Sequence, residues 1–130
     1  MREPNPDGAS APIAMDDIAA VTAAVMLAGP ERYRGATLSL TGPETLTRVD
    51  LLDRIAEALG RPLEFVRASR DETIAALEPA MGENTAWYVE NVLAGYNALG
   101  VPPLPTFEDV TGRSGTTFAA WARQNVATFR

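Results

Sequence analysis

Apolar positions recur along much of the chain at the spacing of helical turns. The first such stretch, residues 18–28, is apolar almost throughout and should end at Gly29-Pro30. Asp16 or Asp17 is expected to cap this helix, because Asp is a favoured N-cap residue. A helix that is apolar nearly all round requires burial on more than one side. The pattern therefore predicts an early helix that needs packing partners.

The strongest helix signal follows Thr47. Thr47 and Asp50 stand three residues apart, in the pattern of a capping box with Asp in place of the usual Glu. The apolar stripe that follows consists of Val49, Leu52, Ile55, Ala56 and Leu59. Gly60 suits the position just after a helix, and Pro62 prevents the helix from continuing.

Further helices are predicted from their caps. Ser69 with Glu72 forms a second capping box, and the helix that it opens should end near Pro79. The caps expected for the last two helices are Asn84 or Thr85, and then Thr116. Their inward faces are expected to carry Trp87, Val92, Tyr96 and Leu99, and then Phe118, Trp121, Ala122 and Phe129.

Two strands are predicted, over residues 36–40 and 63–67. Two strands alone make a poor sheet, so missing sequence, a partner or a second copy should complete it. The predicted fold class is α/β, a helix-rich small domain with a short sheet. Residues 1–11 are expected to form a flexible N-terminal segment, and residues 12–130 the domain itself.

Composition excludes several kinds of chemistry. The 130 residues suffice for one domain, and they include neither His nor Cys nor Lys. Catalysis by a Ser-His-Asp or Cys-His set, zinc binding of the usual kind, and Schiff-base chemistry on lysine are therefore impossible within the chain. The net charge of −6 argues against nucleic acid or an anionic membrane as the main partner.

Nothing in the sequence indicates export or membrane insertion. The first residues are polar and proline-rich, without the apolar core of a signal peptide. The apolar stretch at residues 18–28 is too short to cross a bilayer. We therefore expect a cytoplasmic protein.

Three segments, residues 12–29, 38–66 and 106–125, resemble the C-terminal portion of NmrA-like proteins, which are atypical short-chain dehydrogenase/reductases with an NAD(P)-binding Rossmann domain. The pattern Leu-Thr-Gly-Pro-Glu, followed by Ile-Ala-x-Ala-Leu-Gly-Arg-Pro, is the most specific part. The resemblance implies that this portion supplies the last strands of a Rossmann sheet and a mostly helical subdomain that covers the substrate.

The glycine-rich turn that holds the dinucleotide in that family has no counterpart in this chain. No cofactor is therefore expected for this chain alone, and NAD(P) only if a separate Rossmann half is present. A natural stand-alone homologue and a fragment of an intact reductase or redox-sensing regulator both remain open.

The resemblance also directs attention to the helix that contains Trp87, Tyr88, Asn91 and Tyr96. In the family the equivalent helix helps to cover the substrate, and polar-tipped aromatic side chains suit a small, largely apolar ligand. Met81, in the loop before this helix, could form the pocket rim. The competing interpretation is ordinary core packing.

Catalytic residues are harder to assign. Tyr88 and Glu83 are the candidates, because a hydroxyl or a carboxylate at the edge of an apolar pocket can act as acid or base. The competing interpretation of Glu83 is a solvated side chain near a helix start. No metal site is predicted.

Three functions follow as hypotheses. The first is a small-molecule-binding domain without its own dinucleotide site, whose enzymatic form would be a cofactor-independent cyclase, isomerase or dehydratase for a small hydrophobic substrate. The second is an interaction module that forms a homodimer or binds a Rossmann-type partner. The third is a fragment of an intact NAD(P)H-binding protein.

Overall fold

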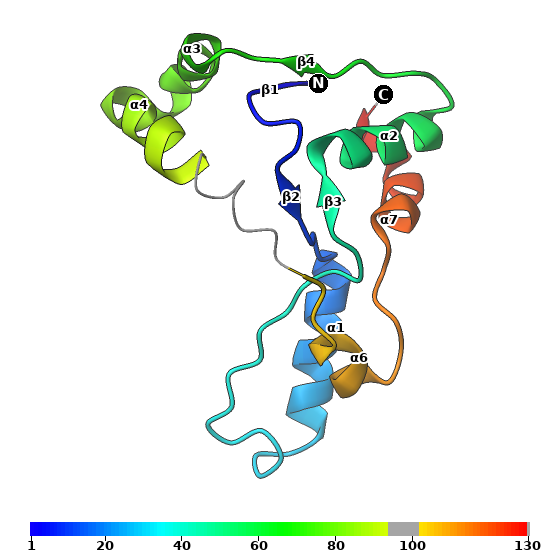
Figure 1. Cartoon of the computed structure of the whole chain (residues 1–130). Helices are drawn as coiled ribbons and strands as arrows, with labels where there is room; N and C mark the ends of the chain where they lie inside the picture. The colour runs from blue at the N-terminus through cyan, green and yellow to red at the C-terminus, as the bar shows by residue number, and fades with distance from the viewer. Residues whose placement is uncertain (94–101, 130) are drawn as a thin grey trace.

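The computed structural model describes residues 1–93 and 102–129, which form helices around short strands (Figure 1). The helical elements are α1 (Met15–Leu27), α2 (Arg48–Leu59), α3 (Arg70–Met81), η1 (Gly82–Asn84), α4 (Thr85–Tyr88), the π-helical turn η2 (Val89–Leu93), α6 (Thr106–Thr111), α7 (Phe118–Gln124) and η3 (Val126–Phe129). The strands are β1 (Arg2–Glu3), β2 (Ala9–Ser10), β3 (Leu46–Thr47) and β4 (Val66–Arg67).

The strands form two separate pairs. β1 lies parallel to β4, with Arg2 opposite Val66, and β2 lies antiparallel to β3, with Ala9 opposite Thr47. The amide N–H of Val66 donates to the carbonyl oxygen of Met1 over 2.8 Å, which extends the first pair by one bond. The sequence predicted no strand in residues 1–11, yet this segment supplies one member of each pair.

The helices α2 and α3 begin where their capping residues predicted. The backbone N–H of Asp50 donates to Thr47 Oγ1 over 3.1 Å, and the Asp50 carboxylate accepts from the Thr47 backbone over 2.8 Å. Ser69 and Glu72 repeat the arrangement at the start of α3. Gly60 ends α2 at φ 67°, a conformation that glycine adopts without strain. Both predicted capping boxes are confirmed.

The predicted cap of α1 is wrong. Ala14 occupies the N-cap position and Met15 is the first helical residue, so both aspartates lie inside the first turn. Asp16 is exposed, whereas Asp17 is 1% exposed and accepts the backbone N–H of Thr116 over 2.6 Å. Arg113 adds a second contact to this carboxylate at 3.1 Å. Asp17 therefore ties α1 to the loop before α7 instead of capping α1.

Other boundaries also differ from the sequence prediction. Residues 36–40 form no strand, because no segment of the described chain pairs with them. The strand predicted at 63–67 is reduced to Val66–Arg67. The helix α3 continues through Pro79, and Thr117 rather than Thr116 caps α7. The predicted inward positions Tyr96 and Leu99 lie outside the described residues.

Helix pairs make most of the packing. α2 packs on α7, α1 on α6, and α3 on α4, and Figure 1 shows these as separate clusters around the strands. The buried apolar side chains are few and spread over these clusters: Val21, Leu46, Leu51, Leu52, Ala68, Val89, Phe107 and Ala122. Over residues 1–93 and 102–129, no helix has both the length and the hydropathy needed to cross a bilayer.

Candidate substrate pocket

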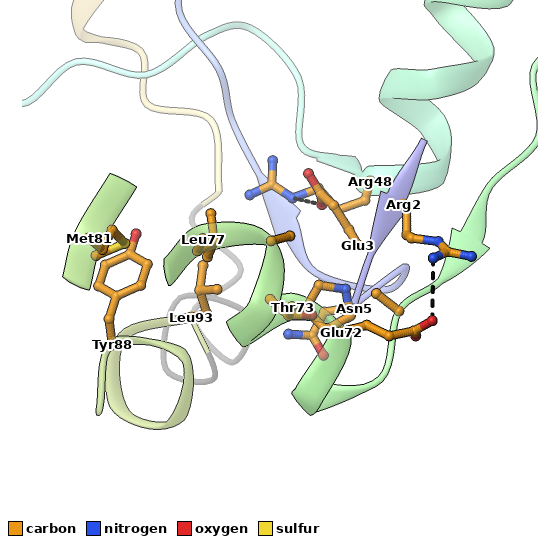
Figure 2. A pocket seen from close by; sticks show the side chains of 13 residues that line it. Arg2, Glu3, Asn5, Arg48, Glu72, Thr73, Leu77, Met81, Tyr88 and Leu93 are labelled. Carbon is orange, nitrogen blue, oxygen red and sulfur yellow. Dashed lines mark hydrogen bonds and ion pairs between the residues drawn. The ribbon is translucent and has the colours of Figure 1, made fainter. Parts of the chain in front are cut away.

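A cavity of about 440 Å³ lies between the N-terminal strand and α3 (Figure 2). Its walls come from five parts of the chain: the segment around β1, the start of α2, the link from β4 to α3, the inner face of α3, and the α4–η2 helix. The lining residues are Arg2, Glu3, Pro4, Asn5, Arg48, Ala68, Glu72, Thr73, Ala76, Leu77, Met81, Tyr88 and Leu93. The volume lies in the range of small-molecule sites.

The α3 wall follows from helical spacing. Thr73, Ala76 and Leu77 are three and four positions apart, so they share one face of α3. The hydroxyl of Thr73 donates to the carbonyl oxygen of Ser69 over 2.8 Å, which removes its need for another partner. The capping box at Ser69 fixes where α3 begins and therefore which face meets the cavity.

The cavity has an apolar end and a polar end. Figure 2 shows Leu77, Met81, Tyr88 and Leu93 gathered at the apolar end. The remaining labelled side chains line the other end, where two ion pairs lie: Arg48 to Glu3 at 3.4 Å, and Arg2 to Glu72 at 3.3 Å. Such a division suits a ligand with an apolar body and one polar group.

Glu72 is held in its charged form at the polar end. The backbone N–H of Ser69 and then its hydroxyl donate to the Glu72 carboxylate, and Arg2 adds a nearby positive charge. These contacts lower the pKa of Glu72 below its ordinary value. Glu72 therefore serves as a fixed carboxylate rather than as a proton donor near neutral pH.

The structure brings two of the sequence-predicted site residues into the cavity. Met81 and Tyr88 line it. Trp87 is 61% exposed, and the Asn91 side chain donates to the carbonyl oxygen of Trp87 over 2.9 Å, so neither faces the cavity. Glu83 is exposed in η1 and does not line the cavity. Tyr96 lies outside the described residues.

Sequence reasoning missed the polar end entirely. Arg2, Glu3, Asn5 and Arg48 reach the cavity from segments that stand far from α3 in the chain. No local pattern marks them, because the pairing of β1 with β4 positions the first three. Arg48 is positioned by the start of α2 instead. Within α3, the spacing of Thr73, Ala76 and Leu77 was the signal that could have identified the α3 wall of the cavity.

Gly42 lies where two segments of the chain cross. A Cβ atom added to Gly42 would lie 1.9 Å from the carbonyl oxygen of Pro12, so the missing side chain allows two segments to cross. At this crossing the amide N–H of Gly42 donates to the carbonyl oxygen of Ala11 over 3.0 Å. No group of three carboxylates in the described ranges could hold a metal ion.

A curated protein and several solved structures are similar to this chain. No family model matches the chain. An NAD(P)H azoreductase of Xenophilus azovorans is 30% identical over an alignment of 122 residues, with 87% of this chain and 40% of that protein covered. The chain thus spans less than half the length of this relative.

Solved structures match over nearly the whole chain. A nucleoside-diphosphate-sugar epimerase from Staphylococcus aureus has a TM-score of 0.76 at 19% identity, with 95% of this chain and 43% of that chain covered. The triphenylmethane reductase of Citrobacter sp. has a TM-score of 0.72 at 18% identity, with 98% and 44% covered. Its complex with NADP(H) has a TM-score of 0.71.

These neighbours are NmrA-like, Rossmann-type proteins, and the match falls in their C-terminal part. The resemblance inferred from the sequence and the predicted helix-rich α/β fold class are both confirmed. The chain is similar to part of an NAD(P)H azoreductase, and it has the fold of the C-terminal part of NmrA-like proteins.

Proposed function

We propose that this chain is a small-molecule-binding domain whose ligand is small and largely apolar. The observation that carries the proposal is the cavity of about 440 Å³ with Leu77, Met81, Tyr88 and Leu93 gathered at one end. Apolar walls with a few polar groups at fixed positions are typical of ligand sites. The π-helical turn η2 supports the same assignment, because such turns occur frequently at functional sites.

Cofactor binding is proposed for a separate Rossmann half and not for this chain alone. The described residues offer no glycine-rich turn that opens a helix, which is the element that receives a dinucleotide pyrophosphate. Calorimetric titration of the chain with NADPH is expected to give no binding heat. Saturable binding of NADPH would contradict this part of the proposal.

A cyclase, isomerase or dehydratase activity remains a finer proposal on the same cavity. Such reactions depend on holding a substrate in a reactive shape more than on a strong nucleophile. Tyr88 would be the side chain to supply a hydroxyl, because it lines the cavity and Glu83 does not. Tyr88→Phe should then abolish turnover while leaving ligand affinity within a few fold.

Ligand binding can be tested with a neutral aromatic probe, naphthalene-2-carboxamide. A ligand of this size should bind with a dissociation constant of about 1 mM or tighter. We expect saturable NMR shifts for the amides of Leu77, Tyr88 and Leu93. Leu77→Ser should weaken binding, because it places a hydroxyl in the apolar end.

The matched control is Leu27→Ser. Leu27 is 88% exposed on α1 and does not line the cavity, so this variant should bind the probe as the unmodified chain does. Shifts that fail to saturate, or an equal effect of both serine variants, would show that the cavity does not bind the probe.

Association with a second copy of the chain is the other function that an observation favours. On α1, Met15 and Met26 are 76% and 77% exposed. Ala19, Thr22 and Ala23 lie between them and are also exposed. The Thr22 hydroxyl donates to the carbonyl oxygen of Ile18 over 2.9 Å, so it needs no partner outside its own helix.

This α1 stripe (Met15, Ala19, Thr22, Ala23 and Met26) suits contact with an identical stripe. The stripe has a methionine at each end and small side chains between them. Two antiparallel copies of the helix would bring Met15 of one copy to Met26 of the other, and the alanines would lie where the two helices approach most closely. We propose a homodimer through this stripe. A monomer that instead binds a separate Rossmann-type chain is the alternative outcome.

A further inference from the structure

We infer that the ligand of the cavity carries a carboxylate, and that Arg48 binds it. This inference rests on the proposed ligand-binding function and specifies the chemical class of the ligand. Arg48 lines the cavity from the first turn of α2, and its side chain is 35% exposed. Arg2, the other arginine of the polar end, is 62% exposed.

The guanidinium of Arg48 is only partly used. Its Nε lies 3.4 Å from Glu3 Oε2, which is longer than the 2.7–2.9 Å typical of a charge-assisted hydrogen bond. Within residues 1–93 and 102–129, no hydrogen bond or ion pair engages its terminal nitrogens Nη1 and Nη2. The planar edge that binds carboxylates with two parallel hydrogen bonds is therefore open.

The backbone fixes Arg48 at the wall of the cavity. Arg48 is the first residue of α2, directly after the Thr47 cap, and its amide N–H donates to the carbonyl oxygen of Gly8 over 3.1 Å. Glu3 contacts the Nε side of the guanidinium from β1. In Figure 2 the terminal nitrogens of Arg48 point toward the side of the cavity where Leu77 lies.

The two ends of the cavity together define the ligand. A carboxylate at Arg48 would place the remainder of the molecule toward Leu77, Met81, Tyr88 and Leu93. The net charge of the chain is −6, so its overall field does not attract anions. A local arginine is then required to retain an anionic ligand, and neither Lys nor His exists in the chain to replace it.

The test compares two probes with the same apolar body, naphthalene-2-carboxylate and naphthalene-2-carboxamide. Calorimetry on the full chain should show the carboxylate binding at least about tenfold more tightly, as a hydrogen bond to a charged group predicts. Arg48→Gln should abolish this preference by weakening carboxylate binding at least about tenfold, and a circular dichroism spectrum like that of the unmodified chain would show that the variant is folded. Arg48→Lys should retain part of the preference, since it keeps the charge without the planar fork.

The matched control is Arg54→Gln. Arg54 lies on the same helix, pairs with Glu57 at 3.2 Å and does not line the cavity, so its loss should leave the preference intact. The carboxylate assignment would be overturned if the unmodified chain bound both probes with equal affinity. The proposed function would still stand if Leu77→Ser then abolished the binding of both probes. A preference that survives Arg48→Gln but disappears in Arg2→Gln would overturn the assignment to Arg48. Binding of neither probe would overturn both proposals.

Discussion

A single buried carboxylate joins two distant parts of this chain. Asp17 on α1 accepts from the Thr116 backbone over 2.6 Å and from Arg113 over 3.1 Å. Arg113 also lies over the ring of Phe107, 4.8 Å from its centroid, so the contact reaches α6. A buried carboxylate is stable only when such donors replace its water. Asp17 therefore anchors α1 against the segment that leads into α7.

Replacing Asp17 with Ala should destabilise the fold. The change leaves the Thr116 N–H without its acceptor and removes the charge that pairs with Arg113. We expect the free energy of unfolding to fall by about 2 kcal/mol, because Arg113 is half-exposed and can regain water. Urea denaturation measures this difference.

The matched control for Asp17 is its neighbour. Asp16→Ala alters an exposed aspartate in the same helical turn, and its effect should stay within about 0.5 kcal/mol. Similar losses in both variants would show that helix-end electrostatics, and not the buried contact, explains the role of Asp17.

Two of the residues predicted for the site come from neighbouring stretches of the chain. Tyr88 and Met81 stand close to one another in the chain, and both line the cavity. Trp87 and Tyr88 were predicted together because they lie on the helix that the family resemblance implies covers the substrate. Adjacent helical positions face different ways, however, and Trp87 is exposed. Arg48 carried no signal, since its role depends on a cavity that α3 and β1 complete.

At the scale of elements, structure set by neighbouring residues could be predicted from the sequence, whereas structure set by distant residues could not. The caps at Thr47 and Ser69 act within four residues, so the sequence placed the starts of α2 and α3 correctly. The strand β1 depends on β4, more than sixty positions away, and no local alternation marks it. The helix α6 was missed, although Phe107 and Val110 stand at helical spacing before Gly112.

The cap of α2 should make stability depend on pH. Hydrogen bonds from the Thr47 hydroxyl and then the Thr47 backbone lower the pKa of Asp50 below its ordinary value of 3.8. Because the folded chain favours the charged carboxylate, this contribution is complete above pH 3.8 and is lost as the pH falls through the lower folded pKa. The cap therefore stabilises the fold at neutral pH and fails in acid.

Asp50→Asn should reveal this dependence. At pH 7 the variant should lose about 1 kcal/mol of unfolding free energy, the usual contribution of a helix cap. The difference from the unmodified chain should shrink as the pH falls below 3.8. Asp53→Asn, an exposed change on the same helix, should show no such trend. If the difference in unfolding free energy between Asp50→Asn and the unmodified chain stayed constant down to pH 2, the role of the Asp50 charge would be contradicted.

The whole molecule exposes more surface than a compact monomer of its size. Its accessible surface is 8468 Å², whereas a 13.9 kDa monomer is expected to expose about 6,700 Å². The excess of about 1,800 Å² on one chain is more than the roughly 800 Å² that each partner buries in a standard interface. Both strand pairs contain only two residues per strand, which is short for an independent sheet. These features favour association through an exposed surface.

The α1 stripe is the surface on which we expect this association to occur. Light scattering on the chain should give twice its 13.9 kDa mass, and Ala23→Glu should restore the mass of a monomer by placing a charge in the apolar contact. Ala80→Glu is the matched control, because Ala80 is an exposed alanine on α3 outside the stripe and should leave the dimer intact. A monomer at every concentration, with unchanged mass in Ala23→Glu, would exclude the homodimer and leave a separate Rossmann-type chain as the candidate partner for α1.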